Sequence, residues 1–274
     1  MFASLRCQTD PCSGAFFGNA SSSSQGTILN FNMATAKGGP AGVVPGGLAS
    51  VLTGTGAGQW RRLTANLGNG TVHLDQPFLT PVDATSVIQL SDMRGRMIFD
   101  GNEYTDVGAF QLYGNAYDVV VANSMYTRTT GLFSWALASS DHDYCPNTHI
   151  ELLSNEVNEG NHLFNYVADR IGSNGIGVEP FDVNIVSENY GGDLPYRGPL
   201  TRFVAMRGNI IHSNGGLLVS GASADVVVEN TRVANSTCPA AIGGVPLRMD
   251  VRCVAVDDTR SSDVVLRGNK YIDG

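Results

Sequence analysis

The sequence has little charge, almost no lysine and no long apolar run. Charged residues make up 15% of its 274 residues, against about 25% in ordinary globular domains. The formal net charge is -8, and the basic residues stand singly apart from Arg61 and Arg62, so no stripe exists to neutralise a phosphate backbone. No run of 18 apolar residues occurs, which excludes a membrane-spanning helix. We therefore expect no nucleic-acid partner and no membrane span.

The C-x-x-C spacing is also absent. The five cysteines are Cys7, Cys12, Cys145, Cys238 and Cys253. Their spacing excludes a zinc ribbon and a thioredoxin-type site. Cys7 with Cys12, or Cys238 with Cys253, could each close a short loop in an exported protein, and buried reduced thiols are the alternative. An odd number leaves one cysteine unpaired in any full disulfide scheme.

Helical patterns are nearly absent, and short apolar runs that end on asparagine take their place. One short helical pattern covers residues 162–172. The successive asparagines of the apolar runs are separated by 21, 32, 34, 20, 21 and 39 positions. The runs are RMIFDGN (Asn102), DVVVAN (Asn123), HIELLSN (Asn155), DVNIVSEN (Asn189), RFVAMRGN (Asn209), DVVVEN (Asn230) and DVVLRGN (Asn269).

These spacings predict an all-β solenoid with coils of about 21 residues, the spacing of 39 being two coils with the middle one near Asp250. Strands without intervening helices cannot form βαβ units. In a strand solenoid, successive turns stack about 4.8 Å apart and equivalent residues form columns. Asparagine suits a column at a corner, because it can bond to its equivalents and tolerates a left-handed backbone. Valine, isoleucine and leucine columns would fill the interior.

The phrases DVVVEN and MRGNII...GGLLVSG resemble coils of the right-handed parallel β-helix, or pectate-lyase-like, superfamily, over residues 90–274. The resemblance implies the fold strongly and an activity hardly at all. Members of this superfamily include polysaccharide lyases, glycoside hydrolases, uronate epimerases, phage tailspikes and adhesins. The lyases typically use a basic residue beside calcium-binding carboxylates, and the hydrolases use clustered aspartates.

The first ninety residues are less regular. Residues 38–58 are rich in glycine and proline and predict a loop with short extended pieces. Residues 59–78 predict a β-hairpin around Gly68, Asn69 and Gly70, with Val72 and Leu74 on one face. This stretch resembles a hairpin module that precedes the coils in phage tail proteins and secreted β-helix proteins. We expect a cap or hairpin portion over residues 1–90, continuous with coils over 91–274.

Candidate site residues lie in two loops, near residues 127–147 and 158–181. The asparagine spacings of 32 and 34 positions predict that these loops are enlarged. Carboxylates there could hold calcium or act as acid and base, and aromatic rings could stack on sugars. The alternative is an ordinary solvated loop, with Phe133 and Trp135 as packing residues. The catalytic candidates are Asp141, His142, Asp143 and Arg197, and the substrate-binding candidates are Trp135, Tyr144, Glu156, Glu159, His162 and Tyr196.

The basic residue of a lyase-type mechanism would have to be an arginine. The two lysines, Lys37 and Lys270, are far in sequence from the enlarged loops, which leaves Arg197 or Arg202. His212 follows Asn209 by the same offset as Asn158 follows Asn155, which predicts a structural histidine at a corner.

Two functions follow as hypotheses. The first is a carbohydrate-recognising β-helix acting in a groove along the coils, as a polysaccharide lyase, epimerase or hydrolase. The second is a non-catalytic structural or adhesive module, such as a tailspike-like protein or an extracellular fibre subunit. Either predicts an extracellular or cell- or virion-surface location, although the opening MFASLRCQTDPCSG has no apolar segment of signal-peptide length. The open last coil predicts a homo-oligomer or continuation by another chain.

Overall fold

The structure of the chain is a computed structural model. It describes residues 16–21, 26–34, 36–38, 43, 45–129, 131–138, 144–159, 183–189, 201–212, 215–221, 223–235, 238, 240–242, 245–257 and 261–272. These ranges contain strands and turns but no helix, and therefore no helix that could cross a membrane. The helix predicted over residues 162–172 lies outside the described ranges.

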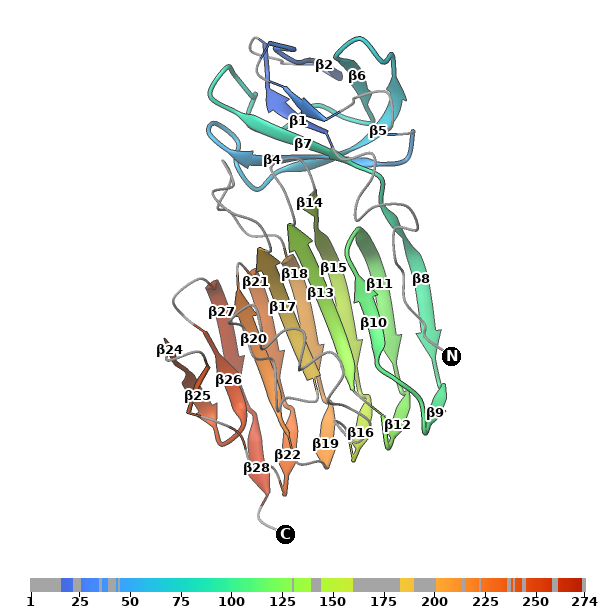
Figure 1. Ribbon diagram of the computed structural model, residues 1–274, viewed down its shortest axis with the longest axis vertical. Coiled ribbons are helices and arrows are strands. Elements are labelled where there is room, and N and C mark those ends of the chain that lie inside the picture. Colours follow the sequence, from blue (N-terminus) through green and yellow to red (C-terminus); the bar gives the residue numbers. More distant parts are fainter. Residues whose placement is uncertain are drawn as a thin grey trace.

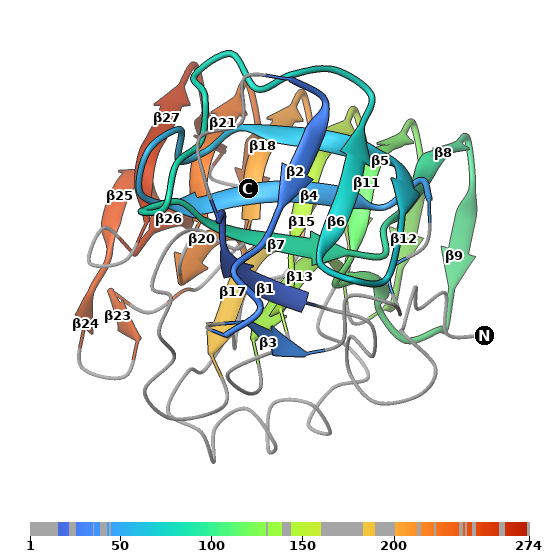
Figure 2. The same ribbon diagram turned by 90° about the horizontal axis from the view of Figure 1, so that it is seen from above.

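The first seven strands form one antiparallel sheet in the order β2-β6-β5-β4-β7-β1-β3. Figure 1 shows this N-terminal sheet above the longer strands that follow, across their upper ends. The view from above agrees (Figure 2). The strands are β1 (Phe16–Asn19), β2 (Ile28–Asn30), β3 (Lys37–Gly38), β4 (Leu48–Thr53), β5 (Trp60–Asn66), β6 (Thr71–Leu74) and β7 (Val87–Ser91).

The predicted hairpin is the β5–β6 pair of this sheet. Gly68 and Gly70 have φ of 74° and 88°, so both occupy the left-handed region that the turn needs. Val72 and Leu74 are both buried, as their alternation predicts. Within the glycine-rich segment before the hairpin, β4 is one of the predicted extended pieces, and it pairs with β5 and β7.

Most of the strands described after β7 form three parallel sheets, which the chain visits in rotation. We call them sheet 1, sheet 2 and sheet 3, and we call one strand from each, in chain order, a rung. The first rung is β8, β9 and β10. Sheet 1 contains β8 (Arg94–Asp100), β11 (Ala116–Ala122), β15 (Asn147–Leu153), β18 (Thr201–Arg207), β21 (Ser223–Glu229) and β27 (Ser262–Arg267).

Sheet 2 consists of shorter strands, and sheet 3 ends in one antiparallel strand, β25 (Arg248–Val251). Sheet 2 contains β9 (Glu103–Thr105), β12 (Met125–Thr127), β16 (Glu156–Asn158), β19 (Ile210–His212), β22 (Arg232–Ala234) and β28 (Lys270–Ile272). Sheet 3 contains β10 (Phe110–Tyr113), β13 (Leu132–Ala138), β17 (Val183–Asn189), β20 (Leu217–Gly221) and β26 (Val254–Val256).

Register between rungs corrects the predicted unit boundaries. Met97 pairs with Val119 and Val204 pairs with Val226, so the two shortest steps are 22 residues. The other steps are longer, because the chain makes insertions either within a rung, as between β16 and β17, or between rungs, as between β13 and β15. Asn189 ends β17 in sheet 3 and starts no new rung, and Asp250 lies in antiparallel β25, not in a separate coil.

The interior of the three sheets is apolar. In sheet 1, the fourth and sixth residues of β11, β15, β18 and β21 point inward, and these side chains are less than 2% exposed. The inward column Val119, Ile150, Val204 and Val226 is continuous over four rungs. The repeated phrases DVVVAN and DVVVEN therefore specify the scaffold.

The corner between sheets 1 and 2 contains two asparagine columns, where the sequence predicted one. The first column holds a left-handed residue in each rung, with φ between 48° and 66°. Its members are Gly101, Asn123, Ser154, Gly208, Asn230 and Gly268. The next position is a polar ladder, half-buried at Asn102 and buried in the other rungs, of Asn102, Ser124, Asn155, Asn209, Thr231 and Asn269. Asn123 and Asn230 thus belong to the left-handed column.

The ladder is held by side-chain to main-chain hydrogen bonds between rungs. The Asn209 side chain accepts a hydrogen bond from the Asn155 backbone N–H at 3.0 Å and donates one to the Leu152 carbonyl at 2.9 Å. Asn155 accepts from the Ser124 N–H in the same way, at 3.2 Å. The ladder satisfies backbone groups that the corner would otherwise leave unpaired.

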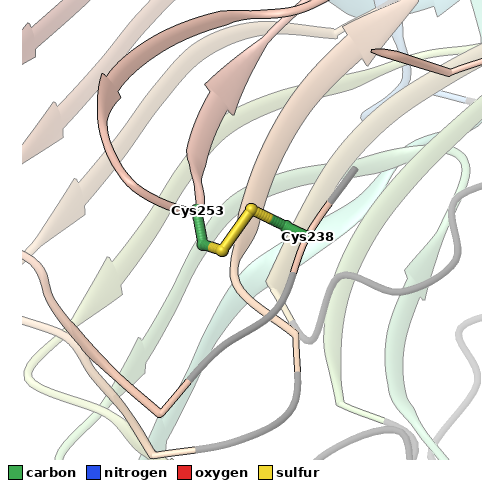
Figure 3. Close-up of a disulfide and its surroundings, with 2 residues drawn as sticks. All are labelled: Cys238 and Cys253. Atoms are coloured by element: carbon green, nitrogen blue, oxygen red, sulfur yellow. A yellow bond between two sulfur atoms is a disulfide. The ribbon is translucent and has the colours of Figure 1, made fainter. Parts of the chain in front are cut away.

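Three short strands complete the described chain: β14 (Tyr144–Cys145), which pairs with β13, and β23 (Ala241–Ile242) and β24 (Val245–Pro246), which pair together. A disulfide joins Cys238 to Cys253 (Figure 3). This is one of the two pairings that the spacing allowed. Cys7 and Cys12 lie outside the described residues.

Candidate functional site

Every strand of sheet 1 contains one left-handed residue within the strand itself. We call this set the bend column, and φ in it lies between 53° and 60°. Aspartate tolerates a left-handed backbone. Residues with bulky side chains rarely adopt it, and each of them destabilises the fold by about 1 to 3 kcal/mol when it does. Such strain is concentrated at functional sites in proteins. The members of the bend column are Arg96, Asp118, His149, Phe203, Asp225 and Asp263.

The two large rings of the bend column, His149 and Phe203, lie on neighbouring rungs. Their ring centroids are 4.9 Å apart. The Trp60 ring of β5 contacts the His149 ring edge-on, at 5.0 Å. An aromatic row therefore runs from the N-terminal sheet across β15 to β18.

A surface hollow of about 360 Å³ lies on the outer face of sheet 1, beside this row. That volume is within the range of small-molecule sites, about 300 to 1,000 Å³. Outward side chains between the inward core residues form its floor, and half of them are apolar. The lining residues are Asp118, Val120, His149, Glu151, Phe203, Val204, Ala205, Asp225 and Val227.

Arg202 places a cation at the edge of the hollow. Its guanidinium donates to the Asp225 carboxylate through Nε at 2.8 Å and Nη2 at 2.5 Å, and it lies 5.0 Å from the centroid of the Phe203 ring. A second, smaller space of about 40 Å³ lies between Arg202 and Trp60. Gly58 approaches here so closely that a Cβ on it would clash with the Arg202 guanidinium.

The surroundings of the hollow favour a neutral imidazole at His149. Burial lowers the pKa of His149, against the smaller, opposing effect of the Asp118 carboxylate. The Thr148 hydroxyl lies 2.8 Å from His149 Nδ1. Asp118 and Glu151 are exposed at the rim. The site thus offers hydrogen-bond acceptors, one arginine and flat apolar surfaces to a ligand.

Most of the candidates predicted from sequence lie outside the described residues, namely Asp141, His142, Asp143, His162, Tyr196 and Arg197. Tyr144 is described as part of β14 by its backbone only. Their roles stay predictions, and so does calcium binding by their loops. Within the described residues, no three histidine, cysteine, aspartate or glutamate side chains are grouped so as to hold a metal ion.

The described candidates do not gather at one place. Trp135 is 4% exposed on β13, so its ring is not open to a sugar, which favours the packing alternative. Glu156 accepts a hydrogen bond from Asn158 at 2.9 Å in sheet 2, and Glu159 lies at the next corner. His212 pairs in register with Asn158 as its offset predicts, and it is exposed.

Sequence reasoning named Arg202 but missed Trp60, His149 and Phe203. The signal that sequence reasoning lacked is the register between strands. The bend column holds aspartate in three rungs, whereas two neighbouring rungs have the rings of His149 and Phe203 at the same position. That contrast is visible only when the strands are aligned on their inward residues, because the intervening step is 54 positions from His149 to Phe203.

No protein-family model matches the chain, and no curated protein sequence matches it. Two phage tailspikes are among the solved structures that show some similarity. The tailspike protein gp49 from Pseudomonas phage LKA1 is 11% identical, with a TM-score of 0.28 over 80% of this chain and 42% of that chain. The Pseudomonas phage phi297 tailspike gp61 is 11% identical, with a TM-score of 0.23 over 81% of this chain and 52% of that chain. The chain therefore spans about half the length of these structures.

Proposed function

We propose that the chain is a right-handed parallel β-helix that recognises carbohydrate in the hollow on sheet 1. Three parallel sheets visited in rotation support the coiled path, and parallel crossover connections are almost always right-handed. The observation that carries the proposed function is the row of Trp60, His149 and Phe203 beside outward carboxylates. Sugar rings present an apolar face to aromatic side chains and hydroxyl groups to carboxylates and arginine.

Strain at the bend column supports a ligand-binding role for these rings. His149 and Phe203 are kept at a left-handed position that aspartate fills in β11, β21 and β27. Phe203 remains 37% exposed, so its ring gains only part of the stabilisation that burial gives. A position that costs the fold free energy and leaves a ring in solvent is explained best by contact with a ligand.

A catalytic role is a second candidate, as a polysaccharide lyase, epimerase or hydrolase. Arg202 and the carboxylates of Asp118, Glu151 and Asp225 gather around one hollow, and these are the side-chain types that such reactions use. A non-catalytic adhesive or structural module would use the same hollow for binding alone. We place the protein outside the cytosol, since the Cys238–Cys253 disulfide persists best in an oxidising compartment.

Binding to a panel of acidic, acetylated and neutral polysaccharides, measured by calorimetry, tests the proposal. We expect Trp60→Ala and Phe203→Ala each to weaken binding about tenfold or more, about 1.4 kcal/mol or more. Leu79→Ala is the matched control, because Leu79 is 89% exposed and lies outside the hollow. Equal binding by all three variants would reject the hollow as the site.

Product release on the same panel separates the two candidates. Elimination would be followed by the absorbance of the unsaturated product and hydrolysis by new reducing ends. Binding without product would support the adhesive module. Turnover that is lost in Arg202→Ala would support the enzyme.

A further inference from the structure

The two ends of the row of rungs are open among the described residues. The outer edge of β8 at one end, and that of β27 at the other, pair with no described strand. Core side chains are only partly buried at both ends, with Met97 and Phe99 on β8 and Val264 and Leu266 on β27. Unpaired strand edges of this kind are templates for another strand.

Ion pairs within the row follow one rule: each joins neighbouring rungs. Arg202 pairs with Asp225, and Glu229 lies between Arg207 and Arg267, with N···O distances of 3.3 and 3.0 Å. The remaining described pair, between Arg128 and Asp106, also joins neighbouring rungs. The column of Arg207, Glu229 and Arg267 alternates in charge, whereas Asp225 is followed by Asp263 and Arg232 by Lys270.

Extending each column by one rung places opposite charges together. If β8 and β9 of a second copy follow β27 and β28 in the established register, then Asp263 meets Arg96, Arg267 meets Asp100 and Lys270 meets Glu103. Each residue continues the column to which it already belongs. All six side chains are exposed in the single chain.

The uncharged columns also continue across this junction. Asn269 would meet Asn102, which extends the buried ladder, and Tyr271 would meet Tyr104, as Tyr104 already stacks on Tyr126 with centroids 4.9 Å apart. On the outer face, Val265 would cover Ile98. In the single chain Val265 is 46% exposed and Ile98 is 75% exposed. Burial of such apolar surface supplies the driving free energy, and the charges specify register.

We propose that a second copy of this chain docks end to end, its β8–β9 edge on the β27–β28 edge. The contact is head to tail, so it leaves both outer ends free and generates open chains, or a ring if the rotation closes. Sheets 1 and 2 carry the contact, because antiparallel β25 occupies the end of sheet 3. This proposal is independent of carbohydrate binding.

Charge swaps that preserve net charge test the docking. The head variant carries Arg96→Asp with Glu103→Lys, and the tail variant carries Asp263→Arg with Lys270→Glu. None of these four side chains makes an ion pair or hydrogen bond within the described chain, and the bend column already accepts both arginine and aspartate, so the fold is expected to persist. Far-ultraviolet circular dichroism checks this for each variant.

Sedimentation velocity over a concentration series gives the readout. We expect the wild type to form dimers and longer chains, and each variant alone to need at least tenfold higher concentration for the same association. An equimolar mixture should again form longer chains, because the wild-type head of the tail variant fits the wild-type tail of the head variant and the swapped head fits the swapped tail. A chain with all four substitutions should associate again.

Three results would overturn the proposal. The first is a wild type that stays monomeric up to its solubility limit. The second is association that neither swap weakens, and the third is a fourfold variant that fails to recover. Ile98→Glu is an independent head variant, and it should weaken association without touching any of the charge pairs.

Discussion

The corner between sheets 1 and 2 and the bend within sheet 1 both place a left-handed residue in every rung, yet their side chains differ. At the corner these residues are glycine, asparagine or serine, whose small side chains fit a left-handed backbone. The bend column holds aspartate in three rungs but also His149 and Phe203. The left-handed backbone therefore costs little free energy at the corner and more in the bend column. The difference supports the proposal that side chains in the bend column serve contacts outside the fold.

The largest expected effect concerns the ladder beside the corner. Asn209→Ala should lower the free energy of unfolding by about 2 to 4 kcal/mol, because buried backbone groups lose their side-chain partners. Asn230→Gly is the contrasting change, at an exposed left-handed position where other rungs have glycine, and it should stay within about 0.5 kcal/mol. Urea denaturation measures both. Similar losses in the two variants would show that the two columns do not have distinct roles.

Much of this scaffold could be predicted from the sequence. Short apolar runs, turn residues and the absence of helical patterns predicted an all-β chain, and β5–β6 is the predicted hairpin. The asparagines were read as one column because both corner positions accept asparagine, and a shift of one residue is invisible without strand pairing. Steps between rungs of unequal length, such as the 54 positions from Asn155 to Asn209, then hid which strands share a sheet.

The site was harder to predict than the scaffold. Dense titratable residues pointed to the loops around Asp141 and Arg197, because polar clusters are visible in linear sequence. The hollow on sheet 1 is assembled from two or three residues on each of four strands, and Trp60 from β5 contacts His149 beside it. Each of these residues is ordinary in its local context. Only the register shows that Phe203 stands where Asp225 stands on the next rung.

A smaller effect tests whether the bend column is strained. Phe203→Asp should leave the free energy of unfolding unchanged or raise it by about 1 kcal/mol, because aspartate tolerates the left-handed backbone, while carbohydrate binding weakens. Phe203→Leu keeps a bulky side chain there and loses the ring contacts with His149 and Arg202. It should therefore be the less stable of the two variants. A leucine variant as stable as the aspartate variant would remove the argument from strain.

The smallest expected effect is a pH dependence of the unfolding free energy. It comes from His149, because Trp60 and Phe203 in the same aromatic row do not titrate. Burial keeps its pKa in the folded protein below the value of about 6.5 for an unfolded chain. The unfolded state therefore binds the proton first as the pH falls through 6.5, and stability decreases towards the lower folded pKa. His149→Asn cannot titrate and suits the left-handed backbone, so its unfolding free energy should fall less between pH 7 and pH 5. Asp118→Asn should make the fall steeper than in the wild type, because the Asp118 carboxylate partly offsets the effect of burial on the His149 pKa. Thermal or urea unfolding at several pH values distinguishes the three proteins, and parallel curves would show that His149 is not the group responsible.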